Sequence, residues 1–237
     1  VMALMALALN SVTKHSGWYV PLMMLGVFGA TMFYGDSVIT PAISVLGAIE
    51  GIAVAAPGTE AWVVPISVVV LVALYSVQSR GTAGIGRWFG PIMVVWFLTL
   101  AVMGVYHIFE APEVLAALNP MHAGRFMLEN KFTAFVALGA VVLAMTGAEA
   151  LYADMGHFGK RPIRMAWFAV AFPALALNYL GQGAMLIQHP DAVSNPFFHQ
   201  VDGWAVYPLV ALSAMAAVIA SQATISGTFS MTKQAIA

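Results

Sequence analysis

The chain has 237 residues, of which 61% are hydrophobic and only 8% are charged, whereas an ordinary soluble domain carries about 25% charged residues. This composition excludes a water-soluble globule and predicts an all-α polytopic membrane protein, with the lipid bilayer as its surroundings. The formal net charge is -1 and there is no cysteine, which argues against a nucleic-acid partner, a disulfide framework and a thiolate site.

The few charged positions divide the sequence into apolar segments of the length that a transmembrane helix needs, about 20 residues. Six spans are predicted, near Pro21 to Ile52, Ala61 to Val77, Trp88 to Phe109, Phe132 to Ala153, Met165 to Ile187 and Trp204 to Met231. The leading segment Val1 to Leu9 is interpreted as the tail of a further helix, because it is too short and wrongly flanked for a signal peptide.

Polar residues and aromatic residues mark the ends of these spans. Trp18, Trp62, Trp88 and Trp204 lie near predicted span ends, as in an aromatic belt. The connections Glu110 to Lys131 and Gln188 to Gly203 carry Pro, Asn, His and Gly, and are predicted to be surface loops.

The distribution of Lys and Arg over the loops predicts the orientation of the helices. Alternating the loops places one group on the cytoplasmic face: Lys14, Arg80, Arg87, Lys160, Arg161, Arg164 and Lys233. Arg125 and Lys131 fall on the outer face, together with the acids Glu60, Glu110, Glu113, Glu129, Asp191 and Asp202. The first complete helix is therefore expected to run outward.

Asp36 lies near the middle of the first predicted span, where an ionised carboxylate costs roughly 2.5 to 3.5 kcal/mol. Asp36, Thr40 and Ser44 recur at i, i+4 and i+8, so three oxygen-bearing side chains share one helix face. Pro41 frees the carbonyl one turn earlier as a further acceptor. This stripe could coordinate a hard cation; the alternative is a protonated Asp36 that bonds to a neighbouring helix, with the hydroxyls bonded to their own backbone.

Glu149 is a second carboxylate within a predicted span, and Thr146 shares its face at i, i+3. Gly147 between them weakens the helix by about 1 kcal/mol relative to Ala, as expected for a broken helix that lines a cavity. The alternative is a protonated, capped Glu149 at a helix-packing contact.

Other polar residues are weaker candidates. Asn178 and Gln182 form an i, i+4 amide pair, and Ser221, Thr224 and Thr228 form a polar stripe; both could line a pathway or simply join helices. Glu50 and Asp154 lie at predicted helix ends, where structural roles are expected, and Asp154 with His157 lacks the further ligands of a zinc site. The Gly81, Gly84 and Gly86 segment is interpreted as a tight turn, since neither a strand nor a Gly-Lys-Ser ending frames it.

Four segments resemble the bacterial Kup (KUP/HAK/KT) potassium uptake permeases. They are residues 34–45 (YGDSVITPAISV), 146–159 (TGAEALYADMGHFG), 178–184 (NYLGQGA) and 220–223 (ASQA). The resemblance implies a potassium/proton symporter of the cell membrane with the inverted-repeat fold of the amino acid-polyamine-cation (LeuT-like) superfamily. Residues 1–237 would be part of one transport domain, from the end of the second helix through the eighth, without the first helix, the later helices and the C-terminal cytoplasmic domain.

The resemblance also implies roles for individual residues. Asp36, Thr40, Ser44, Thr146 and Glu149 match positions of ion binding and coupling, with potassium held through Asp36, Thr40 and Thr146. Tyr34, Asn178, Gln182 and Thr224 are further candidates for lining the pathway. The transported potassium ion and proton are then the only ligands expected, no other cofactor is implied, and the full-length protein is suggested to be a homodimer.

Three other functions are alternatives to potassium symport. An amino-acid or other organic-solute symporter could use the same fold, because fold does not fix function. A passive potassium channel is disfavoured, since the sequence contains no Thr-Val-Gly-Tyr-Gly filter. An enzyme is least expected, because neither a nucleophile with its base nor a metal cluster is visible.

Overall fold

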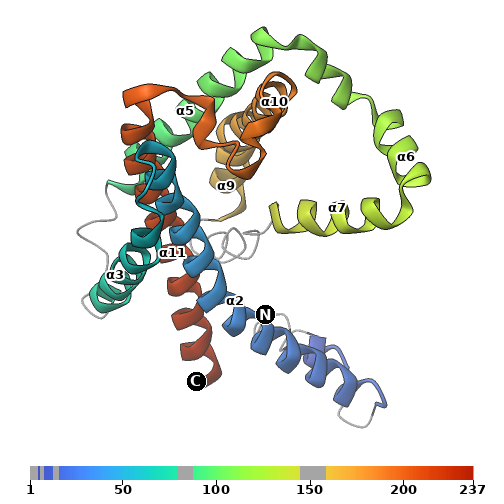
Figure 1. The fold of residues 1–237 in the computed structure, drawn as a ribbon. Coiled ribbons are helices and arrows are strands. Elements are labelled where there is room, and N and C mark those ends of the chain that lie inside the picture. Colours follow the sequence, from blue (N-terminus) through green and yellow to red (C-terminus); the bar gives the residue numbers. More distant parts are fainter. Residues whose placement is uncertain (1–4, 6–7, 13–15, 79–87, 145–158, 237) are drawn as a thin grey trace.

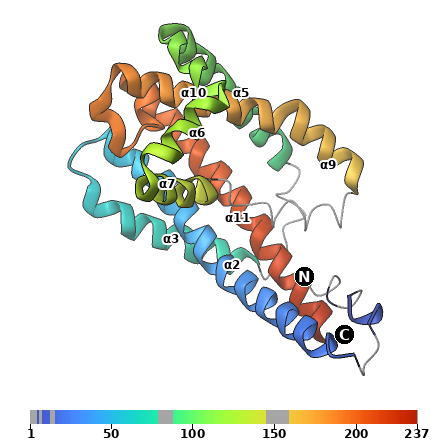
Figure 2. The same ribbon diagram turned by 90° about the vertical axis from the view of Figure 1, so that its right-hand side faces the viewer.

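In the computed structural model, the chain is described for residues 5, 8–12, 16–78, 88–144 and 159–236, and these residues are helical apart from short connections (Figures 1 and 2). The longer helices are α2 (Tyr19–Ala55), α3 (Glu60–Gln78), α5 (Phe89–Glu110), α6 (Pro120–Glu129), α7 (Lys131–Ala144), α9 (Lys160–Ala166), α10 (Phe172–Gln188) and α11 (Val206–Ile236). Short helical turns lie between them: η1 (Pro112–Leu118), η2 (Trp167–Ala171), η3 (Pro190–Ser194), η4 (Phe198–Gln200) and η5 (Gly203–Ala205).

Four of the described helices are long and apolar enough to cross a membrane: Tyr19–Ala55, Phe89–Glu110, Lys160–Gln188 and Gly203–Phe229. They coincide with four of the six predicted spans. The other two predicted spans correspond to shorter apolar helices, Glu60–Ser76 and Lys131–Val142, and the second of these is followed by residues outside the described part. The polytopic helical class is therefore confirmed, while the count of six spans stays a prediction.

Two helix pairs make the most extensive contacts between described elements, α2 with α11 and α5 with α10. In the first pair, Tyr207 of α11 donates to the carbonyl of Ala55 (3.2 Å), and Tyr34 pairs with Thr232 (2.7 Å). The end of α2 thus meets the beginning of α11, so the two helices run antiparallel (Figure 2). This relative direction is the one that the predicted alternation of loops requires.

In the second pair, α5 and α10 are in close backbone contact. A Cβ atom on Gly104 would meet the carbonyl group of Leu177, and one on Gly181 would meet the backbone of Gly104. Small residues allow such an approach between helices in a membrane. Gln188 at the end of α10 donates to the carbonyl of Glu110 at the end of α5 (2.9 Å), so these two helix ends lie on the same side.

A π-helical turn, η2, joins α9 to α10. Pro173, at the start of α10, has no N–H to donate to the carbonyl one turn earlier. Such wide turns occur where a helix absorbs a local disturbance of this kind. The predicted span Met165 to Ile187 is therefore one helix with an irregular turn near its beginning.

The connection from Glu110 to Lys131, predicted to be a surface loop, is largely helical. It contains η1 and α6, and the prediction of a loop is wrong there. Asn119 caps α6 by accepting a hydrogen bond from the Met121 N–H (3.1 Å), and Pro120 occupies the first turn, where its missing N–H costs nothing. In Figure 1, α6 and α7 arch away from α5 and α10.

The buried apolar side chains form small clusters between the helices. One consists of Met103, Phe198, Val206, Leu209 and Val210. It fixes the connection between α10 and α11 against α5, because Phe198 belongs to η4 and is 2% exposed. Many large apolar side chains elsewhere are exposed, including Trp18, Trp62, Trp88 and Trp204, as expected for surfaces that face lipid.

Candidate functional site

Asp36 and Thr40, predicted to form a polar stripe, are in direct contact on α2. The Thr40 hydroxyl donates to Oδ1 of Asp36 at 2.6 Å. The other carboxylate oxygen, Oδ2, is buried and has no hydrogen-bond partner among the described residues. A buried carboxylate oxygen without a partner is costly, so this atom is positioned to take a cation, a proton or a donor from a part of the protein outside the described residues.

The carbonyl that Pro41 releases is already partly occupied. Pro41 is buried within α2, and its ring leaves the carbonyl of Ser37 without an N–H donor from the helix. The hydroxyl of Tyr75, on α3, donates to that carbonyl (3.2 Å), while the Ser37 hydroxyl donates to the carbonyl of Tyr34 (2.7 Å). The carbonyl that Pro41 frees from the helix thus accepts one hydrogen bond from α3, which takes one of the two lone pairs of a carbonyl oxygen.

A cavity of about 520 Å³ lies among α2, α5, α10 and α11, one turn beyond Thr40. The polar side chains that line it are Ser44, Glu50, Asn178, Tyr179, Gln182, Asn195 and Ser213. Three predicted residues, Ser44, Asn178 and Gln182, thus meet at one cavity although they come from distant parts of the sequence. Asp36, Thr40, Tyr34 and Thr224 do not line it.

The predicted amide pair on α10 is confirmed. Nε2 of Gln182 donates to Oδ1 of Asn178 at 2.6 Å. The Asn178 side chain is 4% exposed and its Nδ2 has no partner among the described residues. The pair therefore offers an unused donor and a polarised amide at the cavity wall.

The polar stripe on α11 is arranged differently. The hydroxyls of Ser221, Thr224 and Thr228 donate to carbonyls four residues earlier in the same helix, at 2.7, 3.4 and 3.1 Å. Such back-bonding is the structural alternative to pathway lining. Tyr34, another predicted pathway residue, is engaged with Thr232 of the same helix at 2.7 Å.

The sequence did not single out Glu50 and Gln222 as site residues. The sequence predicts Glu50 at a helix end, but α2 continues to Ala55 and Glu50 lines the cavity. Gln222 is buried and its Oε1 has no partner among the described residues. A polar side chain within an apolar span is the signal that could have found both.

Several predicted residues lie outside the described part of the chain. These are Thr146, Glu149, Asp154, His157 and the Gly81, Gly84 and Gly86 segment. Within the described residues no three His, Cys, Asp or Glu side chains come together. The site there consists of hydroxyl, amide and single carboxylate groups, which are oxygen ligands suited to hard cations.

Comparison with known proteins places the chain in a family. The family model described as "K+ potassium transporter integral membrane domain" matches residues 1–237. Proteins named "Probable potassium transport system protein Kup" from Janthinobacterium sp. (strain Marseille) and Herminiimonas arsenicoxydans are 75% and 71% identical over all 237 residues. A protein of the same name from Methylococcus capsulatus is 58% identical over 238 aligned positions.

The chain spans 38% of the length of these relatives. No solved structure matches it. The match of the family model over the whole chain agrees with the four membrane-capable helices and with the resemblance seen in residues 34–45 and 178–184. The chain belongs to the K+ potassium transporter integral membrane domain family, and is part of a multi-pass protein of the cell membrane.

Proposed function

We propose that the full-length protein takes up potassium across the cytoplasmic membrane as a proton-coupled symporter. This chain would supply the middle of its transport domain. The observation that carries the proposal is the Asp36 and Thr40 pair on α2, which holds a buried carboxylate oxygen without a partner among the described residues. The chain's relatives are named as potassium transport proteins. Potassium prefers oxygen ligands, and a lone carboxylate neutralises a monovalent cation.

The arrangement of helices supports a transport fold. The antiparallel pair α2 and α11 and the closely packed pair α5 and α10 surround the polar cavity, as expected if the chain is part of an inverted-repeat fold with its site near the membrane midplane. In this proposal six helices cross the membrane, and the fourth predicted span, Phe132 to Ala153, is broken at Gly147.

Asp36 and Glu149 would share one ion-binding region, with Thr146 as a further potassium ligand and Ser44 leading to the cavity. Two ionised carboxylates near the midplane should not persist without neutralisation. One potassium ion offsets one charge and a proton offsets the other. One proton per potassium ion is therefore the simplest loaded state, in which binding of either ion favours the other.

Flux measurements on the full-length protein in proteoliposomes test this function. An inward proton gradient at fixed membrane potential should increase potassium uptake. Uptake that ignores the pH gradient would contradict symport and indicate a channel. Competition by an amino acid would contradict potassium as the substrate and indicate an organic-solute carrier.

A further inference from the structure

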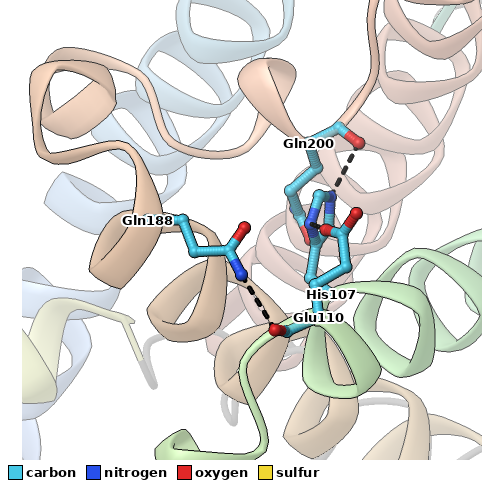
Figure 3. A network of polar contacts seen from close by, with 4 residues as sticks. All are labelled: His107, Glu110, Gln188 and Gln200. Atoms are coloured by element: carbon cyan, nitrogen blue, oxygen red, sulfur yellow. Dashed lines mark hydrogen bonds and ion pairs between the residues drawn. The ribbon is translucent and has the colours of Figure 1, made fainter.

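His107 is a buried titratable residue in the last turn of α5. Its two ring nitrogens contact two oxygen atoms: Nδ1 lies 2.8 Å from Oε2 of Glu110, and Nε2 lies 2.9 Å from the backbone carbonyl of Gln200 (Figure 3). A carbonyl oxygen can only accept, and an ionised carboxylate can only accept as well. A neutral imidazole has one N–H, so it cannot satisfy both contacts.

Both contacts are satisfied only when the His107 and Glu110 pair holds one extra proton. The proton can make an imidazolium beside a carboxylate, or a carboxylic acid beside a neutral imidazole that donates to Gln200. In either form Nε2 donates to the Gln200 carbonyl and a second hydrogen bond joins Nδ1 to Glu110. Loss of the proton leaves one of these short contacts without a hydrogen.

The imidazole ring of His107 is enclosed by neighbouring side chains and backbone. His107 is 8% exposed, and the ring of Tyr106 meets it edge-on with centroids 5.2 Å apart. The titratable groups around it are Glu110 and Tyr106 on α5, and Asp202 in the connection to α11, which interacts with Tyr106. From α10 and η4 the pair is approached by uncharged groups, the side chain of Gln188 and the backbone of Gln200.

Gln200 ends a segment of the α10–α11 connection, from Asn195 to Gln200, that forms part of the wall of the polar cavity and is here named the cover. Asn195, Phe197 and Phe198, just before Gln200 in this connection, line that cavity. Phe197 packs against Trp96 of α5 with ring centroids 5.6 Å apart. A contact that holds the Gln200 carbonyl to α5 therefore holds the cover of the cavity in place.

We propose that His107 and Glu110 form a proton-binding site that fastens the connection between α10 and α11 over the cavity when the proton is bound and loosens it when the proton leaves. The hydrogen bond from Gln188 to the Glu110 carbonyl contains no titrating group, so it holds the ends of α5 and α10 together in both states. The moving part is the segment from Asn195 to Gln200. Because the Glu110 side chain is 38% exposed, the site exchanges its proton with the surrounding water, and its occupancy depends on pH.

Two substitutions should fix the site in opposite states. His107→Gln removes the titrating ring that joins the two acceptors, so this variant is expected to leave the cover loose at every pH. In Glu110→Gln the amide can donate to Nδ1 while Nε2–H donates to Gln200, so the cover is expected to stay fastened at every pH. His189→Gln, an exposed histidine in the same connection, is the matched control.

The measurement is the rate at which a thiol reagent labels a cysteine in the cavity wall. Ser213→Cys is introduced into the purified full-length protein, in detergent, after replacement of its other cysteines, and each variant is compared with the parent at the same pH. Because each variant is compared with the parent at the same pH, the effect of thiol ionisation on the labelling rate is the same in both. The measurement requires no transported ion, so a negative result here can be told apart from a failure of the proposed potassium transport.

At about pH 5.5, His107→Gln should label roughly tenfold faster than the parent, and at about pH 8 the two rates should be equal. Glu110→Gln should match the parent at low pH and label roughly tenfold more slowly at high pH. His189→Gln should match the parent throughout. Equal labelling rates for all variants at both pH values would overturn the proposal. If His107→Gln fails to fold, the comparison of Glu110→Gln with the parent still tests it.

Discussion

Thr40 is the residue whose hydroxyl orients the Asp36 carboxylate. Its contact with Oδ1 at 2.6 Å leaves Oδ2 as the buried oxygen without a described partner. Hydrogen bonds to charged groups are typically worth about 1.5 to 3 kcal/mol. If Asp36 binds potassium as proposed, loss of this hydrogen bond should therefore change the affinity measurably.

Thr40→Val keeps the shape of the side chain and removes this hydrogen bond. We expect the apparent affinity of the full-length protein for potassium to fall by about tenfold or more, measured as the potassium concentration for half-maximal uptake. Thr40→Ser, which retains the hydroxyl, should stay close to the parent. Thr31→Val is the matched control, because among the described residues the Thr31 hydroxyl bonds only back to Val27 on the same helix (3.0 Å). An unchanged affinity in Thr40→Val would remove Thr40 from the site.

Among the helices, α5 and α10 approach each other closely because position 104 of α5 is a glycine. Because a Cβ atom there would meet the backbone of Leu177 and Asn178, Gly104→Ala must push the two helices apart. Overpacking typically costs about 1 to 3 kcal/mol, so the variant should unfold at a lower temperature in detergent. Gly90→Ala on the same helix has open space at its Cβ and should not. Equal melting temperatures for the two variants would contradict the close contact of α5 and α10.

The apolar helices were predictable because charged residues are scarce, and those that are present mark where each long apolar segment begins and ends. α6 was not predicted, since its Pro, His and Gly content outweighed the Asn119 and Pro120 capping signal. The hydrogen bond to the carbonyl of Ser37 was not predicted either, because its donor, Tyr75, lies 38 positions away in the sequence.

The part of the site that lies within single helices was predictable, whereas the contacts between helices were not. Contacts within one helix, such as Thr40 with Asp36 and Gln182 with Asn178, follow from the i, i+4 spacing alone. The cavity that gathers Ser44 and Glu50 with Asn178 depends on how α2 and α10 meet, and the spacing within a helix does not contain that information. His107 and Gln200 are 93 positions apart, so their contact was equally invisible.

At the scale of the whole molecule, the orientation in the membrane remains a prediction with specific consequences. The ends of α5 and α10 lie together, as do the end of α2 and the beginning of α11, which fits one outer face. Positions 113 and 191 should then react with a membrane-impermeant thiol reagent in intact cells after substitution by cysteine. Positions 14, 80, 161 and 233 should react only after the membrane is opened. Labelling of position 161 but not 113 in intact cells would reverse the orientation.

The assignment of ion binding to Asp36 and of proton coupling to Glu149 is the central claim. It is tested most directly by potassium uptake at a series of external pH values in the full-length protein. Asp36→Asn removes a charged ligand and should mainly weaken the apparent affinity for potassium, whereas Glu149→Gln imitates permanent protonation and should mainly abolish the pH dependence. Asp191→Asn, at an exposed position in a connection, should change neither. Parental affinity in Asp36→Asn, or parental pH dependence in Glu149→Gln, would contradict the assigned role.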